Sequence, residues 1–118
     1  MDAAIRLEDI VRELNLKVHC GQELLKRQAS GGYVGDLMSD VLAHARPGNV
    51  WVTMQVHENT VAVAVRNELA AIIISQGREP SKEALQKAAS HEIVLLTSNK
   101  SSFETVAALE RLGLDARN

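Results

Sequence analysis

Aromatic residues are scarce in this chain: one Trp, one Tyr and one Phe amount to 3% of its 118 residues. The hydrophobic core must therefore be built from Ala, Val, Ile and Leu. Such a core favours helices packed against a sheet over an aromatic-rich barrel. The length allows one core but not two, so we expect a single domain over residues 1–118.

Features that would direct the chain to a particular compartment or partner are also scarce. The single cysteine, Cys20, excludes an internal disulfide and fits a reducing cytoplasm. The formal net charge is −2 with both signs mixed, so we expect no nucleic-acid partner. No run approaches the roughly 20 apolar residues of a membrane span, and acids interrupt the N-terminal apolar positions, unlike a signal peptide. We therefore expect a soluble, cytoplasmic protein without a membrane partner.

Short apolar runs alternate with segments of helical spacing through most of the chain. Polar residues 21–32 are bounded by glycine and are expected to form a turn of helix and a loop. Asp36 is expected to cap a helix that Pro47 terminates. This order is typical of βαβ units, so we predict an α/β fold with a mainly parallel sheet covered on both faces. The expected strands are at about 16–20, 50–54, 70–75 and 92–98, and the expected helices at about 5–16, 37–45, 61–70, 79–90 and 103–112.

Residues 60–65 have two interpretations. Their Thr-Val-Ala-Val-Ala-Val alternation suits a strand that would pair with residues 50–56 in a hairpin. Ala is depleted in strands, however, and Val61, Val65 and Leu69 repeat at helical spacing. A helix would also provide the crossover that parallel strands require. We favour the helix.

Polar residues occupy alternate positions directly after the strand expected at 50–54: Gln55, His57 and Asn59. In open α/β sheets, ligands bind beyond the carboxyl ends of the strands, where loops lead into helices. The corresponding loops elsewhere in the chain are also rich in amides, hydroxyls and glycine. The predicted ligand-binding residues are Asp36, Thr53, Gln55, His57, Asn59, Ser75, Gln76, Gly77 and Asn99.

The alternation itself predicts how these side chains are oriented. While the chain stays extended, Thr53, Gln55 and His57 would point to the same side, toward a shared cleft. Asn59 would then turn into a helix start, where it either caps the helix or helps its free N–H groups to hold an anion. The alternative is that Asp36 and Asn59 only cap helices and that His57 is a solvated loop residue.

Motifs for catalysis or metal binding are weak. Nothing matches the phosphate-binding loop G-x-x-x-x-G-K-[ST] or the nucleophile elbow G-x-S-x-G. His19 and Cys20 are neighbours on an expected strand, so they should point to opposite faces rather than form a catalytic pair. Asp36, Asp40 and His44 fall at i, i+4 and i+8, but with Asp36 as a cap we do not favour a metal site. We expect no catalytic residue, no cofactor and no metal.

Three segments carry a recognisable pattern: GGYVGDLMSDVLAHARPGNVWVT, AAIIISQGREPSKEALQKAA and EIVLLTSNKSSFETVAAL. Together they resemble a DRTGG domain over about residues 31–114. Residues 46–49 and Thr53 closely follow the family pattern "RPG-D-hydrophobic-V-I-T". The name-giving residues differ, because "GDR" is replaced by residues 55–57 and "TGG" by residues 75–77. The loop pattern Q-x-H-x-N is similar to that of a stand-alone subgroup often encoded near iron-only hydrogenase genes.

The resemblance implies a three-layer α/β/α sandwich similar to the N-terminal domain of HPr kinase, without kinase chemistry. DRTGG modules occur beside the catalytic parts of some HPr kinase/phosphorylases and phosphate acetyltransferases. The resemblance thus implies a non-catalytic regulatory module that senses a nucleotide or other phosphorylated metabolite at the strand ends. The alternative is an adaptor that docks onto a larger, hydrogenase-related enzyme.

A homodimer is also expected. A chain this short buries only about two-thirds of its unfolded surface, and its expected strands are unusually apolar. Symmetric dimers are the commonest assembly of soluble proteins. Trp51 or Tyr33, near a sheet edge, would be the interface anchors.

Overall fold

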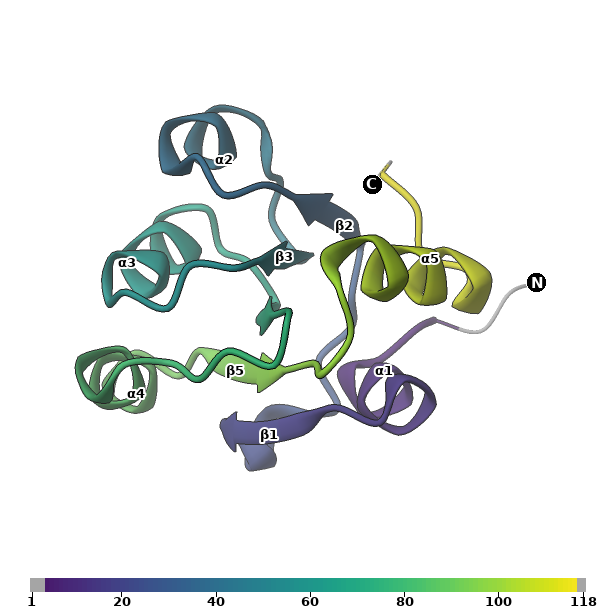
Figure 1. Ribbon diagram of the computed structural model, residues 1–118, viewed down its shortest axis with the longest axis horizontal. Coiled ribbons are helices and arrows are strands. Elements are labelled where there is room, and N and C mark those ends of the chain that lie inside the picture. Colours follow the sequence, from purple (N-terminus) through teal and green to yellow (C-terminus); the bar gives the residue numbers. More distant parts are fainter. Residues whose placement is uncertain (1–3, 117–118) are drawn as a thin grey trace.

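Five strands form one sheet in the computed structural model, which describes residues 4–116 (Figure 1). Residues 1–3 and 117–118 of the expected domain lie outside this range. The strands are β1 (Lys17–Cys20), β2 (Gly31–Val34), β3 (Asn49–Thr53), β4 (Ala71–Ile74) and β5 (Val94–Thr97). The helices are α1 (Leu7–Leu14), the short 3₁₀ helix η1 (Gln22–Leu24), α2 (Met38–His44), α3 (Asn59–Arg66), α4 (Lys82–Ser90) and α5 (Ser102–Leu112).

The sheet is mainly parallel, with the strand order β1-β5-β4-β3-β2. β2, β3, β4 and β5 pair in parallel with their neighbours, and each of the three crossovers between them contains a helix. β1 is the exception, because it pairs antiparallel with β5 at one edge. β2 forms the other edge.

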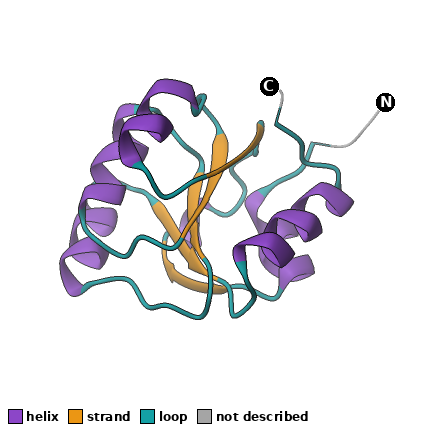
Figure 2. Ribbon diagram, turned by 45° about the horizontal axis from the view of Figure 1, so that its top comes forward, coloured by secondary structure: helices purple, strands orange, loops and turns teal. Residues whose placement is uncertain are grey.

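Helices cover both faces of the sheet, which confirms the predicted three-layer α/β/α sandwich (Figure 1, Figure 2). α2, α3 and α4 pack on one face, and α1 and α5 pack on the other. Side chains of the inner strands alternate between the two layers: Trp51, Ile72 and Leu95 face the three helices, whereas Val50 and Ile73 face the other two. All five are buried, which explains why these strands are continuous apolar runs in the sequence.

Residues 60–65, which had two interpretations, belong to helix α3. Val61, Val63 and Ala64 are buried on its inner side against the sheet layer. The helix carries the chain from β3 to the parallel strand β4, as the crossover argument required. The prediction of a helix is confirmed.

The strand β2 was not predicted. Its residues fall where we expected the end of a loop and the approach to Asp36. The two glycines, Gly31 and Gly32, give no hydrophobic signal, and the strand is held by backbone pairing with β3 from Gly31↔Asn49 to Val34↔Val52. An edge strand of this kind has no periodic apolar pattern that would distinguish it from a loop.

The expectation that Trp51 anchors an interface is wrong. Trp51 lies on the inner strand β3, is fully buried, and donates its indole N–H to the carbonyl of Gly35 at 2.8 Å. Tyr33 does lie on the edge strand β2, where it is half-buried and its hydroxyl contacts the carboxylate of Asp40.

The helices in the described part of the chain are short. The longest, α5, has 11 residues, and none of them is long and apolar enough to cross a membrane.

Candidate functional site

The four parallel strands terminate at the same end of the sheet, with last residues Val34, Thr53, Ile74 and Thr97. Because β1 runs antiparallel to β5, its first residue, Lys17, pairs with Thr97 and also lies at this end. We call the loops that follow the parallel strands the rim: residues 35–37, 54–58, 75–81 and 98–101. Every predicted site residue lies in the rim or directly beside it.

Asp36, Thr53 and Gln55 form one hydrogen-bonded cluster. The Asp36 Oδ1 accepts from the Thr53 hydroxyl at 2.8 Å and from the Met54 N–H at 2.7 Å. Gln55 donates its side-chain amide to the Asp36 carbonyl at 3.0 Å and its backbone N–H to the Thr53 hydroxyl at 3.1 Å. The structure therefore brings these three predicted residues together, and the cluster fixes the loop after β2 against the end of β3.

Asp36 does not cap a helix, contrary to the prediction. The residue that precedes α2 is Leu37, and no side chain accepts a hydrogen bond at that helix start. The Asp36 carboxylate is directed instead toward the donors at the end of β3. The Thr53 hydroxyl and the Met54 N–H thus occupy the oxygen that would otherwise accept from the first turn of α2.

His57 and Asn59 lie at the start of α3 rather than on an extension of β3. The strand ends at Thr53, so the predicted alternation does not reach His57. Asn59 is the first residue of α3, and its side chain does not cap the helix. Its backbone N–H donates to Nδ1 of His57 at 3.1 Å. The N–H groups of Thr60 and Val61 donate to the carbonyls of His57 and Glu58. With these donors engaged, the start of α3 is poorly suited to hold an anion.

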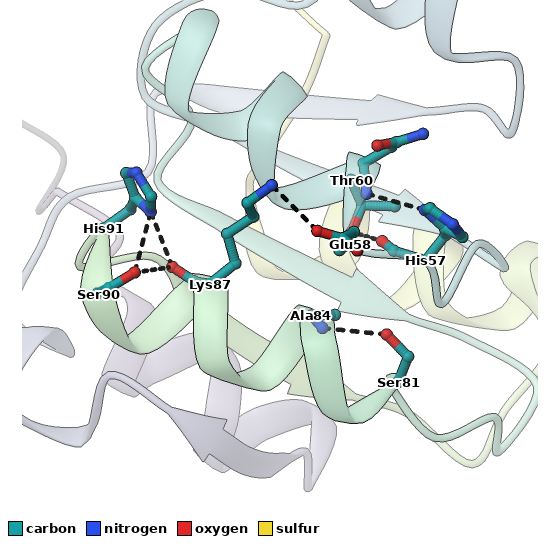
Figure 3. Close-up of polar contacts among 9 residues, drawn as sticks. His57, Glu58, Thr60, Ser81, Ala84, Lys87, Ser90 and His91 are labelled. Atoms are coloured by element: carbon teal, nitrogen blue, oxygen red, sulfur yellow. Dashed lines mark hydrogen bonds and ion pairs between the residues drawn. The ribbon is translucent and has the colours of Figure 1, made fainter.

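One ion pair connects this loop to the neighbouring helix. Glu58 precedes α3 and accepts from the Lys87 ammonium of α4 at 3.1 Å (Figure 3). Both side chains are more than a third exposed, at 39% for Lys87 and 35% for Glu58, so solvent screens the pair. Its main effect is to orient the loop that carries His57.

The loops after β4 and β5 hold the remaining predicted residues close together. The hydroxyl of the buried Ser75 lies 2.6 Å from that of Ser102 at the start of α5. Gln76 and Gly77 both have a left-handed backbone, with φ of 66° and 67°. Their N–H groups donate across the rim to the carbonyls of Lys100 and Ser98 at 2.8 and 2.9 Å. Asn99 lies beside Gly77, 3.8 Å from the position that a Cβ would take there.

The chain changes faces at this point of the rim. The loops after β2, β3 and β4 lead to helices on one face, whereas the loop after β5 leads to α5 on the opposite face (Figure 1). In open α/β sheets, ligands bind where the connections after neighbouring strands lead to opposite faces of the sheet. The reversal lies between β4 and β5, and we name the two loops at this position, residues 75–78 and 98–102, the switch crevice. Here the two loops are hydrogen-bonded to each other, because Gln76 and Gly77 donate to Lys100 and Ser98.

Two cations on the loops of the switch crevice were missed by the sequence analysis. Arg78 follows Gly77 after β4, and Lys100 follows Asn99 after β5; both are exposed. Neither forms a salt bridge with another described residue. The sequence shows one basic residue in each of the two loops. That the two loops lie side by side could not be predicted, because it depends on the strand order.

His19 of β1 lies beside the rim and was not selected by the sequence analysis. The register of β1 shifts between Val18 and Cys20, so regular alternation fails at His19. Its Nε2 lies 2.9 Å from the Thr97 hydroxyl and 3.8 Å from the Glu79 carboxylate. Burial lowers the pKa of His19, the Glu79 carboxylate opposes this change, and Lys17 adds to it.

Cys20 is half-buried, and burial together with Glu23 raises the pKa of its thiol. The thiol is therefore poorly suited to act as a nucleophile. The earlier reason, that His19 and Cys20 point to opposite faces of a strand, does not apply, because β1 is irregular between Val18 and Cys20. Within residues 4–116, no three His, Cys, Asp or Glu side chains lie together in a way that could hold a metal ion. On α2, Nδ1 of His44 lies 3.1 Å from the Asp40 carboxylate; His44 is exposed and Asp40 is half-buried.

A family model described as the DRTGG domain matches residues 9–112. The match begins at residue 9, so it includes most of α1 and all of β1 in addition to the segment from Gly31. No curated protein matches the chain.

Among solved structures, the fold is similar to that in a crystal structure of the CBS and DRTGG domains of the regulatory region of Clostridium perfringens pyrophosphatase, complexed with its activator diadenosine tetraphosphate. The TM-score is 0.70 at 17% sequence identity, with 95% of this chain and 47% of that chain covered. The present chain thus spans about half the length of that regulatory region. At this identity the likeness establishes a shared fold.

Replacing Asp36 with Ala should destabilise the protein. The substitution removes the acceptor of the Thr53 hydroxyl, which is fully buried, and of the Met54 N–H. We expect the free energy of unfolding, measured with urea, to fall by about 1–3 kcal/mol, because a buried donor is left unsatisfied. Asp36→Asn keeps an oxygen acceptor and should lose less. An Asp36→Ala variant as stable as the wild type would show that the cluster does not hold the rim.

His19 should make stability depend on pH. Because its pKa is lowered in the folded state, the unfolded chain binds the proton more readily. The stability that neutral His19 contributes to the folded state is complete above the ordinary histidine pKa of about 6.5. This stability is lost as the pH falls below that value. We expect the melting temperature to fall between about pH 7 and 5.5, and His19→Gln to reduce this fall. His57→Gln, at an exposed rim position, is the matched control; equal slopes for all three proteins would contradict the assignment.

Proposed function

Because the chain belongs to the DRTGG domain family, we propose that it is a non-catalytic regulatory module that binds a nucleotide or other phosphorylated metabolite at the rim. The supporting observation is the switch crevice between β4 and β5. It combines the face reversal that creates ligand sites in open α/β sheets with two cations that form no salt bridge to a described residue, Arg78 and Lys100.

The chemistry of the crevice suits a phosphate group. Guanidinium and ammonium groups make short, charge-assisted hydrogen bonds to phosphate oxygens. The helix α5 begins at Ser102, the last residue of the crevice, and its positive dipole end favours an anion. Ser101 and Glu104 already occupy two donors of this turn through a capping box, so the two cations would supply most of the binding energy.

Other rim residues divide into two groups. Asp36 and Thr53 are bonded to each other, and we assign them a positioning role. The exposed amides of Gln76 and Asn99 flank the crevice and would bind the rest of a nucleotide, its sugar or base. His57 and Gln55 lie farther along the rim, where Nε2 of His57 makes no hydrogen bond to a described residue.

A nucleotide is the first ligand class to test. The pyrophosphatase regulatory region that shares this fold is described in complex with diadenosine tetraphosphate, a nucleotide activator. That observation belongs to the other protein, of which this chain covers less than half. We also propose a cytoplasmic location, because the only cysteine is a free thiol.

A second candidate function is that of an adaptor docking onto a larger enzyme, for which the Q-x-H-x-N loop suggests a hydrogenase-related one. An apolar groove of about 830 Å³ between β2 and α5 favours docking, and it lies on the face of the sheet that α1 and α5 cover. The two functions are compatible, because the groove and the switch crevice share only the first residue of α5.

Ligand binding should appear as a rise in melting temperature that grows with ligand concentration. A ligand at about 100 times its Kd adds about 2.7 kcal/mol to the stability of the folded state. We would screen ATP, ADP, AMP, diadenosine tetraphosphate, phosphate and sulfate. Each charge-assisted hydrogen bond contributes about 1.5–3 kcal/mol, so Arg78→Ala and Lys100→Ala should each raise Kd roughly tenfold or more.

The controls separate the crevice from general charge effects. Lys26→Ala removes an exposed cation outside the rim, so it should leave Kd unchanged. Gln55→Ala and His57→Ala should weaken binding less than the crevice variants. Each removes one partly exposed hydrogen bond, so the free energy of unfolding should fall by about 0.5–1.5 kcal/mol. If no ligand shifts the wild type, or if Lys26→Ala weakens binding as much as Lys100→Ala, the proposed function is wrong.

A further inference from the structure

A third exposed cation lies at the same end of the sheet as the switch crevice. Lys17 is the first residue of β1, the edge strand that pairs antiparallel with β5 (Figure 1). Its side chain is exposed and forms no salt bridge with another described residue. The charge of Lys17 therefore adds to those of Arg78 and Lys100 at this end of the sheet.

The strand register places Lys17 in line with the two loops of the switch crevice. Lys17 pairs with Thr97 of β5, and Thr97 pairs with Ile74 of β4, so one row of residues crosses the three strands. Arg78 and Lys100 lie in the loops that follow Ile74 and Thr97. Neighbouring strands are about 4.8 Å apart, so the backbones of β1 and β4 are roughly 10 Å apart. The cations therefore extend over a distance wider than a single phosphate group.

Lys17 is directed toward the face of the sheet that α4 covers. Leu95 is buried in the layer on that face, and Thr97, two residues later in β5, points the same way. Lys17 is directly opposite Thr97 in an antiparallel pair, so both side chains lie on one face. Burial lowers the pKa of His19, which contacts the Thr97 hydroxyl, and the charge of Lys17 lowers it further. The ammonium of Lys17 therefore lies close to the end of β5.

Lys100 is directed toward the opposite face, because its loop leads to α5. Hydrogen bonds from Ser101 lower the pKa of Glu104 in the first turn of that helix, and the charge of Lys100 lowers it further. Lys17 and Lys100 thus lie on opposite sides of the end of β5. Because like charges repel each other, this arrangement favours binding of two separate phosphate groups over convergence of both cations on one.

We propose that the site takes a chain of two or three linked phosphates, which lies across the end of β5 from Arg78 and Lys100 to Lys17. One phosphate would bind between Arg78 and Lys100, and the next would bind Lys17 through charge-assisted hydrogen bonds. Lys17 is then the residue that distinguishes a di- or triphosphate from a monophosphate. The inference rests on the proposed function and specifies its ligand class, a nucleoside di- or triphosphate or an inorganic chain of the same chemistry.

The position of Glu79 gives an independent check. Its carboxylate lies 3.8 Å from Nε2 of His19, beside the group that Lys17 approaches, and is 65% exposed. A negative charge at this place opposes a phosphate bound to Lys17. Glu79→Gln should therefore lower the Kd of pyrophosphate by a larger factor than that of phosphate.

Isothermal titration calorimetry of the full chain tests the proposal with two matched series: phosphate, pyrophosphate and tripolyphosphate, and AMP, ADP and ATP. In each series the second phosphate should lower Kd roughly tenfold. Lys17→Ala should raise Kd roughly tenfold for pyrophosphate and ADP and leave it unchanged for phosphate and AMP. Lys17→Arg keeps the charge and should keep the preference. Lys26→Ala, which removes an exposed cation outside the rim, is the control and should change no Kd.

The two series also distinguish the source of the phosphate chain. Equal Kd values for pyrophosphate and ADP would show that an inorganic chain is sufficient. Tighter binding of ADP would show that the exposed amides of Gln76 and Asn99 hold the nucleoside. Either result supports a site for linked phosphates.

Two results would overturn the inference alone: equal Kd values for AMP and ADP, or an Lys17→Ala variant that weakens AMP as much as ADP. In both cases the proposed function stands as long as Arg78→Ala weakens binding of AMP. If none of the six ligands binds the wild type, the inference and the proposed function are both wrong. Melting temperatures verify that each variant is folded.

Discussion

Parallel pairing of β2, β3, β4 and β5 is the constraint on which the candidate site depends. Parallel strands need a crossover between each pair, and here every crossover is a helix that returns the chain to the same end of the sheet. All four carboxyl ends therefore meet at one edge, and the loops after them form the rim. The reversal at β5, which sends α5 to the opposite face, then distinguishes the loops after β4 and β5 from the rest of the rim.

The rim is built from side chains that bind one another and side chains that remain in solvent. The Asp36 carboxylate, the Thr53 hydroxyl and the Ser75 hydroxyl are engaged in hydrogen bonds, and they hold the loops in register. Arg78 and Lys100 remain exposed on two loops that are tied together through Gln76 and Gly77. A rigid frame that carries two exposed cations, neither in a salt bridge with a described residue, favours binding of an anion, because little order has to be gained when the ligand arrives.

The sequence predicted the parts of the fold that bury continuous apolar surface. β3, β4 and β5 are covered on both faces, so their continuous runs of Val, Ile and Leu could be recognised as buried strands. Helical spacing of apolar residues identified α3. β2 was missed because its glycines carry no pattern and its stability comes from backbone pairing with β3. The grouping of Asp36 with Thr53 and Gln55 was predicted, but the role of Asp36 depended on the β2–β3 register. His19 and the pair Arg78 and Lys100 were missed because a strand irregularity and the strand order bring them to the rim.

The central claim is that the switch crevice between β4 and β5 is the ligand site, and the most direct measurement is a two-dimensional NMR titration of the backbone amides with ATP. The account predicts saturable shifts concentrated in residues 75–78 and 98–102, with smaller changes at Gln55 and His57. Shifts confined to residues outside the rim, or none at any ATP concentration, would contradict it.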